Sequence, residues 1–241
     1  MIGGQTPRRG WPDGVVQTAL SRRRRLLEKL IPVEERSCLV ETTRIESAKG
    51  GDRLKFFGAF LTRPTTVGAV APSSRRLGRE MIRGLDLDKA DTVVELGPGT
   101  GAFTEIIIDS IGPNTTFFAV ELNPVFARVL GRRFPAITVY NDSAENLCQH
   151  LKSHGKDSVS HVFCGLPWAS LPLKAQEGVF GAIIESLTPG GTFSTFAYGH
   201  ACWFPNAVRF RRRLEQHFSV VKRSRTVWRN VPPAFIYRCT R

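Results

Sequence analysis

The sequence feature that most constrains the fold is a short apolar segment that runs into three closely spaced glycines and then into a helical pattern. It reads "VVELGPGTGAFTE". Gly97, Gly99 and Gly101 allow the backbone to turn sharply and to approach a ligand closely. A strand, a glycine loop and a helix in this order are typical of α/β proteins, in which parallel strands alternate with covering helices.

The same alternation continues toward the C-terminus. After the first strand, residues 92–96, strands are predicted at residues 116–121, 137–142, 159–164 and 191–198, and helices at residues 102–111, 143–151, 173–187 and 206–218. Residues 219–228 and 234–240 then suggest an antiparallel hairpin at one edge of the sheet. The sequence therefore predicts a Rossmann-like α/β fold with a mostly parallel seven-stranded sheet, a C-terminal antiparallel hairpin and an N-terminal helical extension.

The chain divides into three expected segments. Residues 1–50 form a basic extension without sustained periodicity, which we expect to be loosely ordered. Residues 51–83 are expected to form amphipathic helices, because "DRLKFFGAFL" places bulky apolar residues at helical spacing beside basic ones; such a helix fits either a membrane interface or the protein's own core. Residues 84–241 form the α/β domain.

Two helix starts are marked by capping residues. Ser73 or Ser74 can cap a helix that runs through Ile82. Asn123 can cap a second helix, with Pro124 at its first position.

The basic charge is concentrated at the two ends of the chain. The net charge is +13, with seven Lys or Arg against two acids in residues 1–30 and ten against one in residues 206–241. Such ends attract a polyanion, either nucleic acid or an anionic membrane surface. No apolar run of about 18 residues is present, so no membrane-spanning helix is expected. The sequence shows no export signal, and we expect a cytoplasmic protein.

The five cysteines are scattered along the chain and lack a C-x-x-C spacing. This pattern argues against a disulfide framework and against a zinc site. We therefore expect reduced thiols and no metal.

Three acidic residues stand at the ends of three consecutive predicted strands. Glu95 would orient the glycine loop or an amino-acid group, Glu121 would accept both hydroxyls of a ribose, and Asp142 would accept an adenine amine. The glycine spacing G-x-G-x-G suits a ligand without a pyrophosphate, such as S-adenosylmethionine. The residues expected to bind this cofactor are Glu95, Gly97, Gly99, Gly101, Glu121, Leu122, Asp142, Ser143 and Ala144.

The fourth strand delivers the segment "CGLPWASLP" to the same edge of the sheet. In nucleic-acid amino methyltransferases an Asn or Asp at this place holds a planar amine, and an aromatic residue stacks on the base. Leu166, Pro167 and Trp168 match the later positions of that pattern, but Gly165 has no side chain that could accept a hydrogen bond. The carbonyls of Cys164 and Gly165 could still orient an aliphatic amine; the alternative is an ordinary turn with Trp168 as a packing residue.

Four sequence blocks together resemble the bacterial phospholipid N-methyltransferases. They are "FFGAFLTRPTTVGAVAPSS", "VVELGPGTGAFTE", "CGLPWASLP" and "VWRNVPPAFIYR", and the similarity runs from about Phe56 to the C-terminus. The resemblance implies a class I methyltransferase that uses S-adenosylmethionine to convert phosphatidylethanolamine toward phosphatidylcholine. It also implies a helix at about residues 52–61 that anchors the protein on the membrane surface and covers the cofactor, and a peripheral position on the inner face of the membrane.

The chemistry of methyl transfer to an amine suggests further roles at the substrate. Arg225 and Arg229 would pair with a lipid phosphate, the faces of Trp168 and Tyr198 would favour a developing ammonium, and His200 and Tyr198 would be candidate proton acceptors. The expected partners are an anionic membrane surface and an aminophospholipid; nucleic acid is not expected.

Three other functions remain open at this point. The basic ends and Leu166-Pro167-Trp168 would also fit an RNA adenine dimethyltransferase, although Gly165 argues against it. The acceptor could instead be the free amine of an ornithine-type aminolipid. A noncatalytic membrane-binding module that retains the glycine loop is the third alternative.

Overall fold

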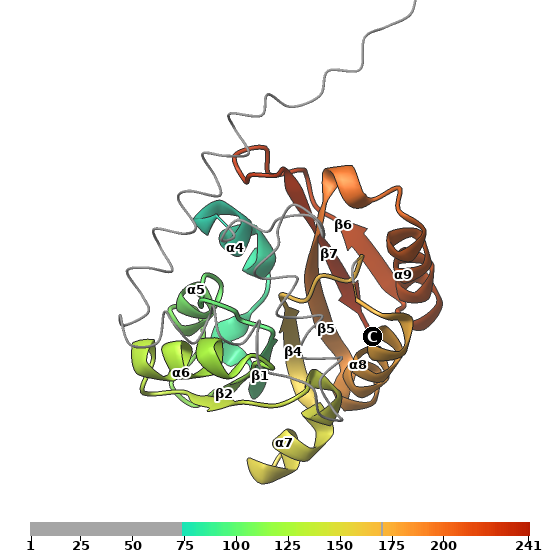
Figure 1. Cartoon of the computed structure of the whole chain (residues 1–241). Helices are drawn as coiled ribbons and strands as arrows, with labels where there is room; N and C mark the ends of the chain where they lie inside the picture. The colour runs from blue at the N-terminus through green and yellow to red at the C-terminus, as the bar shows by residue number, and fades with distance from the viewer. Residues whose placement is uncertain (1–73, 170) are drawn as a thin grey trace, which may run out of the picture.

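The computed structural model describes residues 74–169 and 171–241. The expectations for residues 1–50 and for residues 51–73 lie outside this part of the chain. The described part is one α/β domain around a seven-stranded sheet (Figure 1).

The sheet has the strand order β3-β2-β1-β4-β5-β7-β6. The first five strands in sequence pair in parallel, whereas β7 pairs antiparallel with both β5 and β6. The strands are β1 (Thr92–Leu96), β2 (Thr116–Val120), β3 (Thr138–Tyr140), β4 (Val159–Cys164), β5 (Leu187–Tyr198), β6 (Val220–Arg223) and β7 (Ala234–Thr240). The predicted Rossmann-like sheet with its C-terminal antiparallel hairpin is confirmed.

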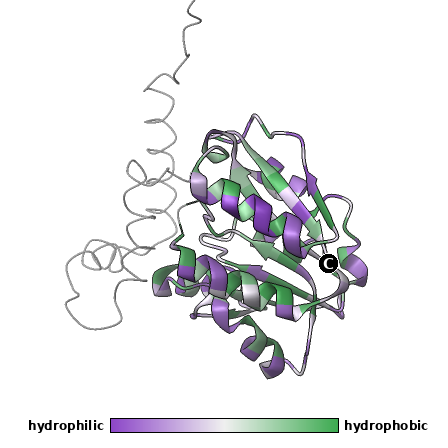
Figure 2. Cartoon of the chain, turned by 90° about the vertical axis from the view of Figure 1, so that its right-hand side faces the viewer, coloured by the Kyte–Doolittle hydropathy of each residue, from purple (hydrophilic) through white to green (hydrophobic). Residues whose placement is uncertain are grey.

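Helices cover both faces of the sheet (Figure 1). The α-helices are α4 (Arg75–Ile82), α5 (Thr104–Ile108), α6 (Pro124–Arg133), α7 (Leu147–Ser153), α8 (Leu173–Ser186) and α9 (Pro205–His217). Three single 3₁₀ turns are η1 (Leu87–Lys89), η2 (Ala144–Asn146) and η3 (Gly199–Ala201). In Figure 2 the strands between the helices are largely hydrophobic, whereas the helices combine hydrophobic and hydrophilic residues.

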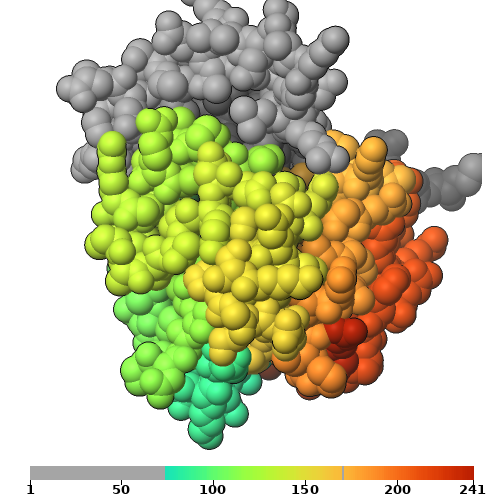
Figure 3. Space-filling model, turned by 90° about the horizontal axis from the view of Figure 1, so that it is seen from below, coloured from blue at the N-terminus to red at the C-terminus, as the bar shows by residue number. Residues whose placement is uncertain are grey.

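Successive residues of a strand point to opposite faces of the sheet and so belong to two separate hydrophobic cores. On β1, Val94 belongs to the core beneath α7, α8 and α9, whereas Val93 belongs to the core beneath α4 and α5. Figure 3 views the molecule from below, where α7, in yellow, lies between the green and the orange parts of the chain.

The two predicted capping residues are found at their helix starts. The Ser74 hydroxyl accepts a hydrogen bond from the Leu77 N–H, and the Asn123 side-chain oxygen accepts from the Val125 and Phe126 N–H groups. Pro124 occupies the first position of α6, where a missing N–H costs nothing.

The strand predicted at residues 219–228 is shorter than expected, because β6 ends at Arg223. Ser224 then exchanges hydrogen bonds with the backbone of Ile236, and its hydroxyl accepts from the Ile236 N–H. Beyond it, a single bridge joins Val227 to Ala234. Residues 224–233 therefore form a long turn rather than a continued strand.

Helix α4 is fixed to the hairpin at both of its ends. The Arg238 guanidinium, from β7, donates to the carbonyls of Glu80 and Met81 at 2.9 and 3.2 Å. The Ser74 N–H donates to the side-chain oxygen of Asn230, in the β6–β7 turn, at 2.9 Å. In residues 74–169 and 171–241, no helix is long and apolar enough to cross a membrane.

Packing of α4 predicts a stability effect. Met81 is fully buried, so Met81→Ala should lower the free energy of unfolding by about 2–5 kcal/mol because a cavity remains. Arg79→Ala, at an exposed position of the same helix, should change it by less than about 0.5 kcal/mol. Urea unfolding measures both variants, and equal effects would contradict this packing.

Candidate active site

The site is built where β1, β2 and β4 end side by side. Register pairs Leu96 with Val120 on one side and with Cys164 on the other. The next residues, Gly97, Glu121 and Gly165, are therefore neighbours at one edge of the sheet. This edge lies where the sheet order reverses between β1 and β4, which is where open α/β sheets bind ligands.

The glycine loop adopts a backbone that requires glycine. Gly97, Gly99 and Gly101 have φ angles of 68°, 58° and 82°, all in the left-handed region. A Cβ on Gly97 would also lie 2.6 Å from the Leu166 side chain. The sharp turn that the glycine spacing predicted is thus present, and a side chain at Gly97 would also collide with Leu166.

Glu121 is completely buried and holds the glycine loop. One carboxylate oxygen accepts the Gly99 N–H and the other accepts the Asn123 N–H, both at 2.9 Å. Burial raises the pKa of Glu121 to about 7, although these backbone N–H groups act in the opposite direction. Each carboxylate oxygen retains a second lone pair with which it could accept a hydroxyl.

Glu95 is the second fully buried acid of the site. Its Oε2 accepts the Thr104 hydroxyl at 2.6 Å, but no described residue donates to its Oε1. Burial raises the pKa of Glu95 to about 8, and the negative charge of Glu121 adds to this rise. A buried carboxyl oxygen without a partner is costly, so a ligand donor or cation would stabilise it.

Asp142 follows β3 at the same edge of the sheet. Its carboxylate accepts the Asn146 side-chain amide at 2.9 and 3.0 Å, the Ser143 N–H at 2.7 Å and the His150 Nε2 at 2.9 Å. Burial opposes ionisation, but these hydrogen bonds outweigh it and the pKa of Asp142 is lowered. Asp142 is therefore a preformed anionic acceptor.

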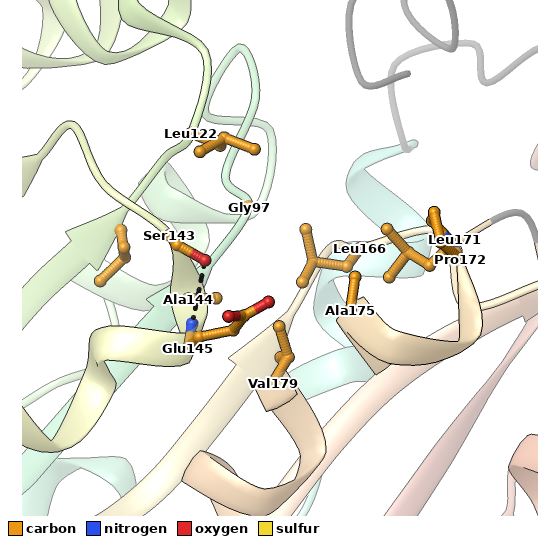
Figure 4. A pocket seen from close by; sticks show the side chains of 11 residues that line it. Gly97, Leu122, Ser143, Ala144, Glu145, Leu166, Leu171, Pro172, Ala175 and Val179 are labelled. Carbon is orange, nitrogen blue, oxygen red and sulfur yellow. Dashed lines mark hydrogen bonds between the residues drawn. The ribbon is translucent and has the colours of Figure 1, made fainter. Parts of the chain in front are cut away.

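A pocket with a mostly apolar lining opens between these strand ends and α8 (Figure 4). It is lined by four of the predicted cofactor residues and by Leu166 of the acceptor segment. The four are Gly97, Leu122, Ser143 and Ala144. Sequence reasoning missed Glu145 and the α8 residues Ala175 and Val179, because nothing in a helix pattern indicates which side chain borders a neighbouring strand end.

These features fit S-adenosylmethionine. The apolar pocket suits an adenine ring, Glu121 could accept ribose hydroxyls, and the unpartnered oxygen of Glu95 could accept a positively charged amino group. All of these groups meet at the glycine loop.

The acceptor segment approaches the glycine loop so closely that no side chain fits at Gly165. A Cβ at this position would lie 2.4 Å from the Gly97 carbonyl oxygen. The Gly165 N–H donates to the Leu96 carbonyl at 2.8 Å, and no described residue donates to the Gly165 carbonyl. The contact between the two loops therefore requires a residue without a side chain at position 165, and this explains why no side-chain acceptor is present there.

Trp168 lies in the core. Its ring is 4% exposed, it stacks on Phe210 of α9 with 4.3 Å between ring centroids, and its Nε1–H donates to the Thr195 hydroxyl. That hydroxyl in turn donates to the Cys164 carbonyl at 2.9 Å. These contacts support the packing alternative, because the ring is not open to a ligand here.

Gln176 of α8 holds the second half of the acceptor segment in place through two hydrogen bonds. This α8 side chain is 2% exposed and donates to the carbonyls of Trp168 and Leu171 at 2.7 and 3.0 Å. Sequence analysis missed Gln176 and Thr195; the available signal is a polar residue among the apolar residues that face a core.

The predicted substrate residues lie on the β5–β7 side of the sheet. Tyr198 ends β5 and contacts Phe196 and His200, the latter exposed. Arg225 and Arg229 are exposed on the β6–β7 turn. The structure therefore brings the cofactor residues and Gly165 together, whereas the roles of Tyr198, His200 and the two arginines stay predictions.

Removal of the Glu121 carboxylate should prevent cofactor binding. The carboxylate could no longer accept the two ribose hydroxyls of the cofactor. Glu121→Ala should therefore weaken affinity for S-adenosylmethionine at least about 100-fold. Glu215→Gln, on exposed α9, should bind like the unaltered protein. Isothermal titration calorimetry measures both, and retained affinity in Glu121→Ala would sink the assignment.

The raised pKa of Glu95 predicts a pH-dependent stability. The unfolded chain loses this proton near pH 4.5 but the folded, ligand-free protein holds it until about pH 8. The contribution of Glu95 to the stability of the folded protein is therefore fully present below pH 4.5 and is lost as the pH rises toward 8. The free energy of unfolding of Glu95→Gln, relative to that of the unaltered protein, should therefore rise by on the order of a few kcal/mol between pH 5 and pH 8.5. Parallel pH–stability curves from urea unfolding would contradict this burial.

Comparisons with known proteins agree with this geometry. No protein-family model matches the chain. The ornithine lipid N-methyltransferase of Singulisphaera acidiphila is 34% identical over 191 residues, which cover 78% of this chain and 95% of that protein. The ribosomal RNA small subunit methyltransferase A of Hydrogenobaculum sp. is 30% identical over only 79 residues, 33% of this chain and 31% of that protein.

Among solved structures, the O-methyltransferase TomG from Streptomyces achromogenes in complex with S-adenosylmethionine matches with a TM-score of 0.56. The match covers 87% of this chain and 99% of that chain at 16% identity, and it shows the fold. The chain therefore belongs to the family of the Singulisphaera ornithine lipid N-methyltransferase, and it is a class I methyltransferase whose cofactor is S-adenosylmethionine.

Proposed function

We propose that this protein transfers methyl groups to the free amine of an ornithine-type aminolipid. The observation that carries the proposal is the similarity to the ornithine lipid N-methyltransferase, which extends over 95% of that protein. The sequence resemblance favoured phosphatidylethanolamine as the acceptor. Both lipids offer a primary aliphatic amine, so the same site chemistry serves either, and the curated relative favours the ornithine headgroup.

The acceptor segment supports an aliphatic rather than a planar amine. A planar base amine is held by a side-chain amide or carboxylate, and the contact between Gly165 and the Gly97 carbonyl leaves no room for one. An aliphatic amine needs only to lose its proton to become a good nucleophile. The same contact disfavours the RNA adenine alternative, whose curated relative matches a third of the chain.

The chain's own residues have to bind, orient and desolvate the reactants. S-adenosylmethionine supplies a methyl group that is activated by its sulfonium charge. The Gly165 carbonyl, which accepts no hydrogen bond from the described residues, is the candidate acceptor for the substrate amine. Leu122 and Leu166 would exclude water from the pocket. Arg225 and Arg229 could pair with the carboxylate of an ornithine headgroup as well as with a phosphate.

A competition between acceptors tests the proposal. The purified protein is incubated with S-adenosylmethionine labelled in the methyl group, in separate detergent micelles of ornithine lipid and of phosphatidylethanolamine, and with total RNA. We expect label in ornithine lipid at a rate at least about tenfold above the other acceptors. Label mainly in phosphatidylethanolamine would restore the expectation drawn from sequence, and label in RNA alone would overturn the lipid assignment.

The contact at Gly165 predicts a sharp mutational effect. Gly165→Ala should lower methyl transfer at least about tenfold, because the new Cβ forces the acceptor segment away from the glycine loop. The φ angle of Gly165 is not in the left-handed region, so the effect would come from this contact and not from backbone strain.

Gly181→Ala is the matched control, because a Cβ there meets nothing within 4 Å in helix α8. This variant should keep full activity and gain about 0.5–1 kcal/mol of stability. Circular dichroism checks that both variants fold. Unchanged activity in Gly165→Ala would show that the two loops need not touch.

A further inference from the structure

Exposed apolar side chains gather on two turns of the described chain. Trp203 and Phe204, between β5 and α9, are 86% and 52% exposed. Trp228 and Val231, on the β6–β7 turn, are 74% and 41% exposed. Large aromatic residues bury most of their area in ordinary soluble proteins, so two nearly bare tryptophans indicate a surface that contacts something else.

The two turns adjoin each other at the start of β7. The Gly199 N–H, just before the first turn, donates to the Pro233 carbonyl at 2.9 Å. The Val227 N–H, in the second turn, donates to the Ala234 carbonyl at 2.7 Å. We call Trp203, Phe204, Trp228 and Val231 the aromatic patch. The β6–β7 turn, which carries Trp228 and Val231, is at the top of Figure 1, and the Ser74 N–H at the start of α4 donates to Asn230 in this turn.

The aromatic patch also adjoins the acceptor segment. The Asn206 side-chain amide, two residues after Phe204, donates to the Ala169 carbonyl at 3.4 Å. On the other side, Asn230 is 1% exposed and donates to the Pro232 carbonyl, which fixes the turn that carries Trp228. The patch is therefore held in a defined position next to the loop where the substrate amine is expected.

The charges around the patch are positive. Between Glu185 and Glu215, and from there to the C-terminus, the sequence contains no acidic residue. Arg225 and Arg229 are exposed on the turn with Trp228, and Arg209 is exposed on the helix that follows Phe204. Exposed tryptophans with surrounding arginines match a membrane interface, where the rings sit at headgroup level and each arginine attracts anionic lipid.

We propose that the aromatic patch docks on an anionic membrane surface and thereby presents the acceptor segment to lipid headgroups. This inference rests on the proposed lipid substrate, and it names the surface through which the site reaches that substrate. The chemistry favours a bilayer over a protein partner because the patch combines amphipathic rings, neighbouring positive charge and a turn that is hydrogen-bonded to the acceptor segment through Asn206.

The test uses the full chain and vesicles of phosphatidylglycerol and phosphatidylcholine. The unaltered protein should sediment with anionic vesicles, and more weakly with pure phosphatidylcholine or at high salt. Trp203→Ala/Trp228→Ala should weaken this binding at least about tenfold. Val220→Ala is the control, because Val220 is similarly apolar and 41% exposed but pairs with Thr240 at the opposite end of the hairpin; it should bind like the unaltered protein.

Activity in detergent micelles separates this inference from the proposed function. The double variant should methylate micellar ornithine lipid at the unaltered rate, because no membrane has to be reached. If no lipid is methylated in micelles, the proposed substrate fails while the vesicle comparison still decides the docking surface. Vesicle binding that is unchanged in the double variant would overturn the inference. So would an unaltered protein that ignores vesicles and dimerises through these tryptophans in size-exclusion chromatography.

Discussion

The backbone contact between Gly97 and Gly165 is the constraint on which the active site depends. It joins the glycine loop, which is predicted to bind the cofactor, to the segment that we propose receives the substrate amine, and the Gly165 N–H donates to the neighbouring Leu96 carbonyl. A side chain at Gly165 would collide with the Gly97 carbonyl, and a side chain at Gly97 would be strained by its positive φ angle and would collide with the Leu166 side chain. The contact therefore sets how closely the glycine loop and the acceptor segment approach, and it leaves no room at position 165 for the side-chain acceptor that a planar amine would need.

Around this contact the protein keeps two buried acids in a state that is unfavourable without a ligand. One oxygen of Glu95 has no partner among residues 74–169 and 171–241, and both Glu95 and Glu121 have pKa values raised by burial. A cofactor that carries positive charge compensates this cost, since it favours the ionised carboxylates. Cofactor binding and the ionisation of these two acids are then linked. Asp142 differs, because its own hydrogen bonds favour the ionised carboxylate without a ligand.

Sequence patterns predicted the strands, a helix cap at Ser73 or Ser74, a second cap at Asn123 and the positions of the three acids, because these depend on local chemistry and on strand order. They did not predict that β6 ends at Arg223, since the competing hydrogen bonds of Ser224 with Ile236 join residues far apart in the sequence. They also left open whether Trp168 would face substrate or core. Its stacking on Phe210 comes from α9, a helix whose packing no local pattern specifies.

We propose that the transferred methyl is bound to the free amine nitrogen of an aminolipid. The most direct measurement is mass spectrometry of lipids that were incubated with the protein and with S-adenosylmethionine carrying a deuterated methyl group. We expect ornithine lipid that is heavier by one or more deuterated methyl groups, and we expect fragmentation to place each label on the terminal nitrogen. A label on a headgroup oxygen, or a lipid fraction without label beside labelled RNA, would contradict it.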